Sequence, residues 1–78
     1  MKEGTILSVI KDRFCATYAS RRDINRMSAE DNTKMDRFYL KPGVLVVFLK
    51  SDPANEESQI LHPEHGIIWC DNAAFCIA

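Results

Sequence analysis

The sequence predicts a mainly β, single-domain protein, and three observations carry this prediction. Apolar residues make up 46% of the 78 residues and charged residues 27%, which is enough apolar material for a single core. The apolar residues recur in short runs that are rich in β-branched side chains, with turn-forming residues between the runs. No apolar run is longer than the six residues of 44–49, whereas a membrane-spanning helix needs about 20. We therefore expect a small antiparallel barrel of five or six strands over residues 1–78.

The first part of the chain contains two predicted strands. Residues 5–10 are rich in β-branched side chains, and residues 14–18 place Phe14, Ala16 and Tyr18 on one face. The polar residues 11–13 lie between these two segments. This arrangement predicts a hairpin that pairs the first strand with the second.

Residues 21–37 interrupt the strand pattern. Nine of these seventeen residues are charged. Ile24 and Met27 have helical spacing, and Ser28 to Asp31 resembles the capping box that begins a helix. A structureless loop of this length is uncommon in a compact domain. We expect a short helix, a folded-back hairpin loop, or a functional loop that a partner orders.

The rest of the chain returns to strands. Lys41-Pro42-Gly43 has the residue order of a type II turn. Residues 44–49 are apolar on both faces, which predicts a central strand that is buried on both sides. A surface loop is predicted for residues 51–58, and short strands for residues 59–61, 67–70 and 73–77, with a two-residue turn at Asp71-Asn72.

The charges are distributed unevenly along the chain. Residues 1–50 contain ten Lys and Arg and six Asp and Glu, a net of +4, whereas residues 51–78 contain five acids and no Lys or Arg, a net of −5. The two halves either form oppositely charged faces that orient a partner, or interleave in space and neutralise each other. The small total charge of −1 and the apolar content exclude a disordered chain.

The cysteines and the start of the chain bear on localisation. Three cysteines, at spacings of 55 and 6, do not form a disulfide framework, and this favours a reducing compartment. The first residues lack the apolar stretch of a signal peptide. We expect a cytoplasmic protein without a membrane-spanning segment.

Three short segments carry a family resemblance. Ala16-Thr17-Tyr18-Ala19-Ser20 resembles the Ala-Leu-Tyr-Asp-Tyr segment of the Src-homology-3-like small barrels. Leu40-Lys41-Pro42-Gly43-Val44-Leu45-Val46-Val47 resembles their Phe-x-x-Gly-Asp-x-Leu-x-Val segment, and Gly66-Ile67-Ile68 resembles their late Gly-x-Ile. The resemblance spans residues 14–77 and implies a small barrel of this architecture.

The same resemblance indicates which ligand to exclude. Members that bind polyproline hold it between several stacked aromatic rings. Tyr18 is the one counterpart of those rings here, because Ser20 stands in place of the second tyrosine. We therefore do not expect a proline-rich ligand.

Metal-ligating and catalytic residues form no strong motif. His62, His65, Cys70 and Cys76 are the one cluster of metal-capable side chains. The two histidines span a turn, however, and five residues separate the two cysteines, whereas a structural zinc site usually has two close pairs, often Cys-x-x-Cys. We interpret them as two surface histidines of a turn and two small buried cysteines, and expect no metal and no cofactor. There is no phosphate-binding glycine loop, carboxylate pair or nucleophile motif, so we expect no catalytic residue and no enzymatic activity.

The candidate binding residues are basic or aromatic. They are Tyr18, Arg21, Arg22, Arg26 and Trp69. Trp, Tyr and Arg dominate binding hot spots, and the long charged segment is typical of accessory or inhibitor-like proteins, of the kind that phages and mobile elements encode. We expect this segment to dock a protein partner. The alternative is a small barrel that binds nucleic acid with the same residues, through guanidinium contacts to phosphate and stacking on Tyr18; an enzyme subunit or metal-binding module comes third.

Overall fold

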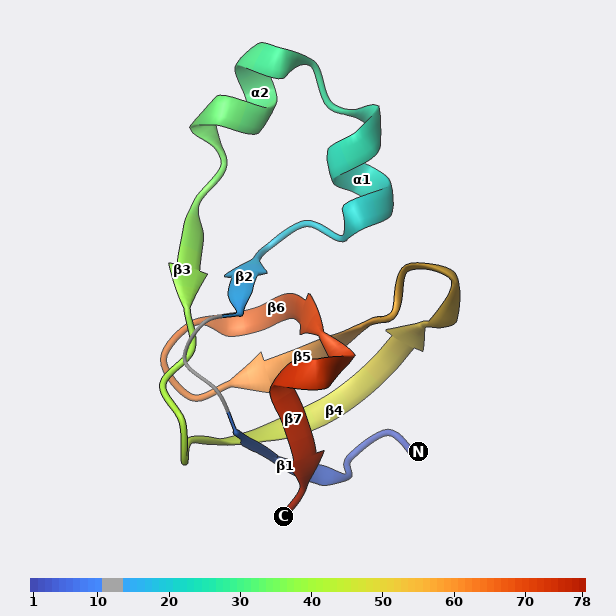
Figure 1. Ribbon diagram of the computed structural model, residues 1–78, viewed down its shortest axis with the longest axis vertical. Helices are drawn as coiled ribbons and strands as arrows, with labels where there is room; N and C mark the ends of the chain where they lie inside the picture. Colours follow the sequence, from blue (N-terminus) through green and yellow to red (C-terminus); the bar gives the residue numbers. More distant parts are fainter. Residues whose placement is uncertain (11–13) are drawn as a thin grey trace.

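The computed structural model describes residues 1–10 and 14–78 and is mainly β (Figure 1). Within this part of the chain, seven strands form one open antiparallel sheet in the order β3-β2-β6-β5-β4-β1-β7. The strands are β1 (Ile6–Val9), β2 (Cys15–Thr17), β3 (Arg37–Tyr39), β4 (Leu45–Asp52), β5 (Glu57–His62), β6 (Gly66–Asp71) and β7 (Phe75–Ile77). The helices are α1 (Arg21–Arg26) and α2 (Ala29–Lys34), with 3-10 turns η1 (Pro53–Asn55) and η2 (Asn72–Ala74).

The prediction of a mainly β domain is confirmed, but the predicted number of strands is wrong. The structure has seven strands instead of five or six, and they form an open sheet with β3 and β7 at its edges. Residues 37–39 form a separate strand because they pair with β2, with Phe38 opposite Ala16. Propensity gives little signal for a strand of three residues, so its existence depends on that partner.

The predicted hairpin between the first two strands is also wrong. β1 pairs with β4 on one side and β7 on the other, so its partners lie far away in the sequence. β2 instead pairs with β3 and, at Thr17 and Trp69, with β6. The polar residues 11–13, on which the hairpin prediction depended, lie outside the described residues.

The predicted turn at residues 41–43 agrees with the structure. Gly43 has a φ of +86°, which an L residue with a side chain rarely adopts. Its backbone N–H donates to the Val9 carbonyl at 2.8 Å, and the Val9 N–H donates to the Val44 carbonyl at 3.0 Å. The turn therefore starts β4 in register with β1.

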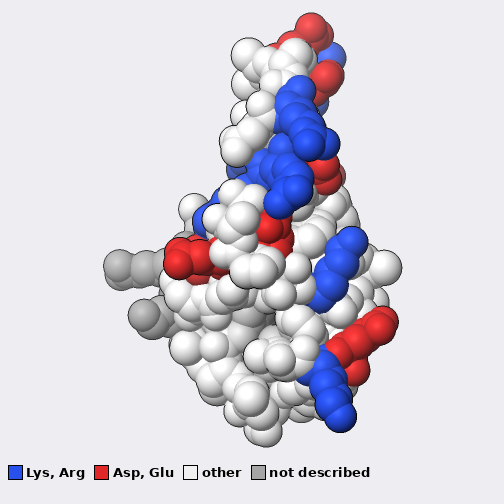
Figure 2. Space-filling model, turned by 90° about the vertical axis from the view of Figure 1, so that its right-hand side faces the viewer, with Lys and Arg blue, Asp and Glu red and all other residues white. Residues whose placement is uncertain are grey.

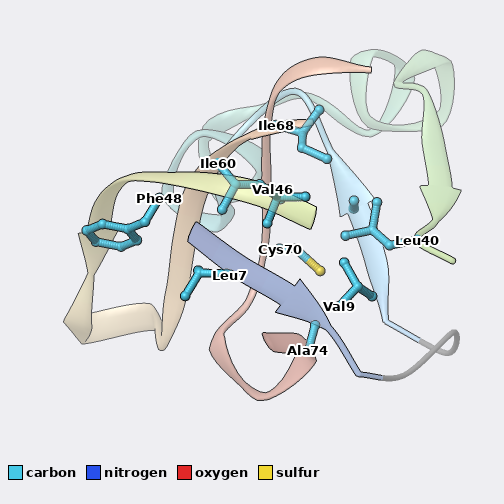
Figure 3. Close-up of a cluster of buried hydrophobic side chains, with 10 residues drawn as sticks. Leu7, Val9, Leu40, Val46, Phe48, Ile60, Ile68, Cys70 and Ala74 are labelled. Atoms are coloured by element: carbon cyan, nitrogen blue, oxygen red, sulfur yellow. The ribbon is translucent and has the colours of Figure 1, made fainter. Parts of the chain in front are cut away.

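The core lies on the concave side of the curled sheet (Figure 3). Side chains from β1, β4, β5 and β6 point toward one another there, and Leu40 and Ala74 close the sides. Ala16, Ile60 and Ile68 have no exposed surface, and Val46 is 1% exposed. The cluster consists of Leu7, Val9, Ala16, Leu40, Val46, Phe48, Ile60, Ile68, Cys70 and Ala74.

The prediction that residues 44–49 are buried on both faces is wrong. Val46 and Phe48 point into the core, whereas Leu45 points outward and is 56% exposed. β4 does lie inside the sheet, with β5 and β1 on its two sides. The apolar run indicates that side chains on both faces of the strand favour burial. No element of the described chain covers the second face of β4, however, so that face stays partly exposed.

Two short helices lie within residues 21–34. The sequence allowed either a short helix or a loop in this segment. Ser20 caps α1 by accepting a hydrogen bond from the Asp23 N–H at 3.2 Å, and Ser28 caps α2 by accepting one from the Asp31 N–H at 3.1 Å. The second cap is the one that the sequence indicated. Among the residues that the structure describes, no helix combines the length and apolar character needed to cross a membrane.

Candidate functional site

Residues 21–36 form an arm that extends away from the sheet (Figure 1). The arm contains α1, α2 and their connections, and neither helix has a buried residue. Ile24, Met27 and Met35 are partly exposed. Isolated helices of six residues are unstable in water, because each turn must be nucleated at a cost that so few hydrogen bonds do not offset. The arm therefore depends on its caps and on how its base is attached.

A network of polar contacts attaches the base of the arm to the sheet. The Arg21 guanidinium contacts the Asp71 carboxylate at 2.8 Å and donates to the Asn55 carbonyl at 2.8 Å. The Arg21 backbone N–H donates to the Glu57 carboxylate at 2.7 Å. Glu57 is 3% exposed, which makes it the most buried acid of the described chain. These contacts hold the first turn of α1 against β5 and β6.

The charges of this base network shift the pKa values of its members. Burial raises the pKa of Glu57, although the Arg21 N–H and guanidinium oppose the shift. Burial also tends to raise the pKa of Asp71, but the Ala73 N–H and the Arg21 guanidinium outweigh it, so that pKa is lowered. The hydrogen bond from Arg21 to Asp71 raises the pKa of the guanidinium. Arg21 and Asp71 thus stay charged at neutral pH and remain paired.

A shallow groove of about 430 Å³ lies beside this base. Its walls come from α1, from the end of β4 and from β6. Arg22 contacts Asp52 across it at 3.4 Å, and the Lys50 ammonium lies 5.6 Å from the centroid of the Trp69 ring. Trp69 projects from the outward side of β6, because its neighbours Ile68 and Cys70 point into the core.

The groove brings together two of the predicted binding residues, Arg22 and Trp69. Arg21 lies next to it, because its partner Asp71 is two residues beyond Trp69 in β6. The two charged halves of the sequence therefore interleave here, since both arginines pair with acids of the second half. The interpretation that the halves neutralise each other agrees with these contacts.

Tyr18 lies on the other side of the sheet from Trp69. Its ring is 5.5 Å from Phe38, which in turn stacks on His65 at 4.0 Å. His65 continues the row to His62 at 4.6 Å. Tyr18 lies at the end of this row and is 51% exposed. The structure does not join it to the groove.

Arg26, at the end of α1, is exposed. Other arm cations are engaged: Lys34 contacts Glu30 at 3.0 Å, and Arg37, just after the arm, donates to Asn32. Within the described residues, Arg26 is the arm cation with no ion pair or side-chain hydrogen bond. Figure 2 shows Lys and Arg gathered along the narrow projection, with Asp and Glu near its tip and its base.

Of the four metal-capable side chains, His62 and His65 lie together, with their ring centroids 4.6 Å apart. Within residues 1–10 and 14–78, no three His, Cys, Asp or Glu side chains come together in a way that could hold a metal ion. Two details of our interpretation were wrong: His62 is 4% exposed and so is not a surface residue, and Cys76 is exposed. Cys70 is buried, and burial raises the pKa of its thiol to about 12, so it is not a thiolate at neutral pH.

Sequence reasoning missed Lys50, Asp52 and Glu57 as parts of the site. Lys50 directly follows the apolar run of residues 44–49. The residue that pairs with it, Gln59, lies in the next strand, so the sequence does not show what surrounds Lys50. Asp52 and Glu57 lie in a stretch for which the sequence predicts a surface loop. The available signal was the missing Lys and Arg in residues 51–78, which indicated that these acids would need cations from the first half.

Comparison of the chain with protein-family models, with curated proteins and with solved structures gives no match. The site therefore has to be interpreted from its own geometry and chemistry.

Proposed function

We propose that this chain is a non-enzymatic protein-docking domain, in which the curled sheet is the scaffold and the arm binds a protein partner. The observation that carries the proposal is the arm itself: two capped helices without a buried residue, attached through a charged base. Segments that contribute nothing to a core and are positioned by a rigid scaffold are where binding residues concentrate. An accessory or inhibitor-like role suits a domain of this size.

The apolar side chains of the arm support a protein partner. Ile24 and Met27 are three residues apart and lie on one side of α1, and Met35 follows α2. All three are only partly covered. Arg26 stands at the end of α1 beside Met27. Partly exposed apolar side chains and a free guanidinium are typical of a docking hot spot, and methionine adapts to the shape of a partner.

The electrostatics of the arm weigh against a polyanion as the partner. Residues 21–36 contain four cations and four acids, so their formal net charge is zero. Arg21, Arg22 and Lys34 already have carboxylate partners. Nucleic-acid modules instead present a clear excess of unpaired positive charge.

A capture experiment with matched variants tests the proposal. Tagged full-length protein is cross-linked in lysate of its native host, and captured proteins are identified by mass spectrometry. We expect one protein to be captured by the parent, to be lost with Arg26→Glu and with Met27→Ser, and to be retained with Lys2→Glu. Lys2 is an exposed cation outside the arm, so Lys2→Glu makes the same charge change elsewhere. Capture that the arm variants leave unchanged contradicts the proposal.

The second candidate function is nucleic-acid binding, favoured by the cations gathered along the projection (Figure 2). It requires affinity for oligonucleotides that falls steeply between roughly 50 and 200 mM salt. Fluorescence anisotropy with single- and double-stranded DNA and RNA at both salt levels separates the two functions. Tight, salt-dependent binding that Arg26→Glu abolishes and Lys2→Glu preserves would replace the protein-docking proposal.

A further inference from the structure

The outward side of the sheet carries a row of uncovered apolar side chains. Cross-strand pairing joins β1, β4, β5 and β6 into one row, in the order Ile6, Val47, Leu61, Ile67. Ile6, Leu61 and Ile67 are 46%, 44% and 53% exposed. Leu45, one step along β4, is 56% exposed. The alternate residues of the same strands fill the core, so these side chains point to the opposite side.

We call this side the outer face and define it by eight residues. They are Ile6, Ser8, Leu45, Val47, Gln59, Leu61, Ile67 and Trp69. None of the eight is charged, and the charged neighbour on this side is Lys50, which pairs with Gln59 at one end of the face. A sheet face that meets water normally alternates with polar side chains, as in the outward residues of a sandwich. An apolar face of this kind marks a surface that another molecule covers.

We propose that the outer face is covered by a second copy of this chain, with two sheets packed face to face. The row itself is self-complementary. A two-fold axis that lies between the two sheets and runs parallel to the strands, midway between β4 and β5, places Ile6 opposite Ile67 of the second copy. The same axis places Val47 opposite Leu61 of the second copy. Every member of the row thus meets an aliphatic side chain of similar size, as an isologous interface requires.

The charges permit this association. The central row of Ile6, Val47, Leu61 and Ile67 contains no charged residue, so the two copies bring no like charges together at its centre. Lys50 lies at one end of the face, with its ammonium over Trp69. The whole chain carries a formal charge of only −1, so repulsion between copies at longer range is weak. The base network, with its Arg21 and Asp71, lies beyond Trp69 at one end of the face and stays at the rim. An apolar centre with a polar rim is the ordinary arrangement of an interface.

The area that the outer face can bury indicates how tightly two copies associate. Four strands about 4.8 Å apart, with about five residues each at about 3.3 Å per residue, cover on the order of 300 Å² per copy. Interfaces that bury less than roughly 1,200 Å² in total are weak and transient. We therefore expect a reversible dimer that forms in the micromolar to millimolar range of concentration.

Sedimentation of the full-length protein, with reductant present to keep Cys15 and Cys76 as thiols, tests the inference. The parent is expected to pass from monomer to dimer between about 10 µM and about 1 mM, the range that weak association covers. Leu61→Lys puts two unpaired charges into the centre of the interface. It should raise the dimer dissociation constant at least roughly tenfold, because a buried charge without a partner is strongly unfavourable. Circular dichroism should show an unchanged fold, since the Leu61 side chain is exposed in the monomer.

Ile77→Lys is the matched control. Ile77 is 68% exposed but belongs to the edge strand β7, where it pairs with the core residue Leu7. This variant should dimerise like the parent. A dimer that Ile77→Lys abolishes and Leu61→Lys preserves would assign the contact to edge pairing of β7 and overturn the inference, as would a parent that stays monomeric at about 1 mM, where even weak complexes form.

NMR dilution of the parent gives a readout that does not depend on any substitution. Methyl shifts that change with concentration should be confined to the outer face, with Ile6, Val47, Leu61 and Ile67 as the reporters. Shifts confined to the arm or to β7 would contradict the inference. Arg26→Glu should leave the dimer intact, so the result stands or falls separately from the function proposed for the arm.

Discussion

The curled sheet and the arm differ in where their apolar side chains lie. In the sheet, Ile60 and Ile68 have no exposed surface, whereas neither helix of the arm contains a buried residue. The sheet is held by pairing between distant strands, and the arm by two serine caps and one charged base. The difference teaches that stability and surface available for binding reside in separate parts of this small chain. Substitutions confined to one part should therefore differ widely in their effect on the whole.

The largest effect is expected at the core. Phe48 is 5% exposed, and Phe48→Ala removes most of a buried side chain. The loss should be about 3–5 kcal/mol in the free energy of unfolding, which is enough to unfold a domain of this size or nearly so. Leu45→Ala, on the outward side of the same strand, is the control and should cost much less. Urea unfolding measures both losses. A Phe48→Ala variant as stable as the parent would contradict the placement of Phe48 in the core.

A smaller effect is expected from pH, through His62. Its Nδ1 accepts hydrogen bonds from the backbone N–H groups of Glu64 and His65, at 3.0 and 3.3 Å, in the turn between β5 and β6. Burial, and then the neighbouring His65, lower the pKa of His62 below its ordinary value of 6.5. A lowered pKa in the folded state means that the neutral form stabilises the fold above pH 6.5. This stability is lost as the pH falls from 6.5 through the lowered pKa.

Urea unfolding at pH 7.5 and 5.5 measures this loss. The free energy of unfolding should be lower at pH 5.5 than at pH 7.5, because the unfolded state binds the proton that the folded His62 resists. His62→Asn keeps an acceptor near the same place without a titratable group, and it should make the loss over this interval smaller than in the parent. Equal losses in the parent and in His62→Asn would contradict the role given to this histidine.

The smallest effect is expected at the arm. Replacing residues 23–36 with a short Gly-Ser linker keeps Arg21, Arg22 and the base network. The free energy of unfolding should change by less than about 1 kcal/mol, because no buried residue is removed and exposed ion pairs contribute little. Circular dichroism and urea unfolding check this. A replacement that unfolds the sheet would show that the arm is part of the folding unit and would remove the distinction between the two regions.

Much of the secondary structure could be predicted from the sequence, because its signals are local. β-branched runs marked most of the strands, Lys41-Pro42-Gly43 marked a turn that needs a positive φ, and Ser28 marked the start of α2. The candidate binding residues, among them Trp69 and Arg22, were chosen by residue type, because Trp and Arg side chains are common in binding hot spots. What they contact was not predictable from type alone.

Tertiary structure alone decided which segments meet and which side of the sheet stays uncovered. β1 pairs with β4 and β7 instead of its neighbour β2, and Arg21 finds Asp71 fifty residues away. The apolar run around Val46 and Val47 indicated burial on both sides, but the described chain covers only one side. The physical reason is that a hydrophobic pattern states which side chains favour leaving water, whereas the partner that removes them is chosen by the whole fold or by a second molecule.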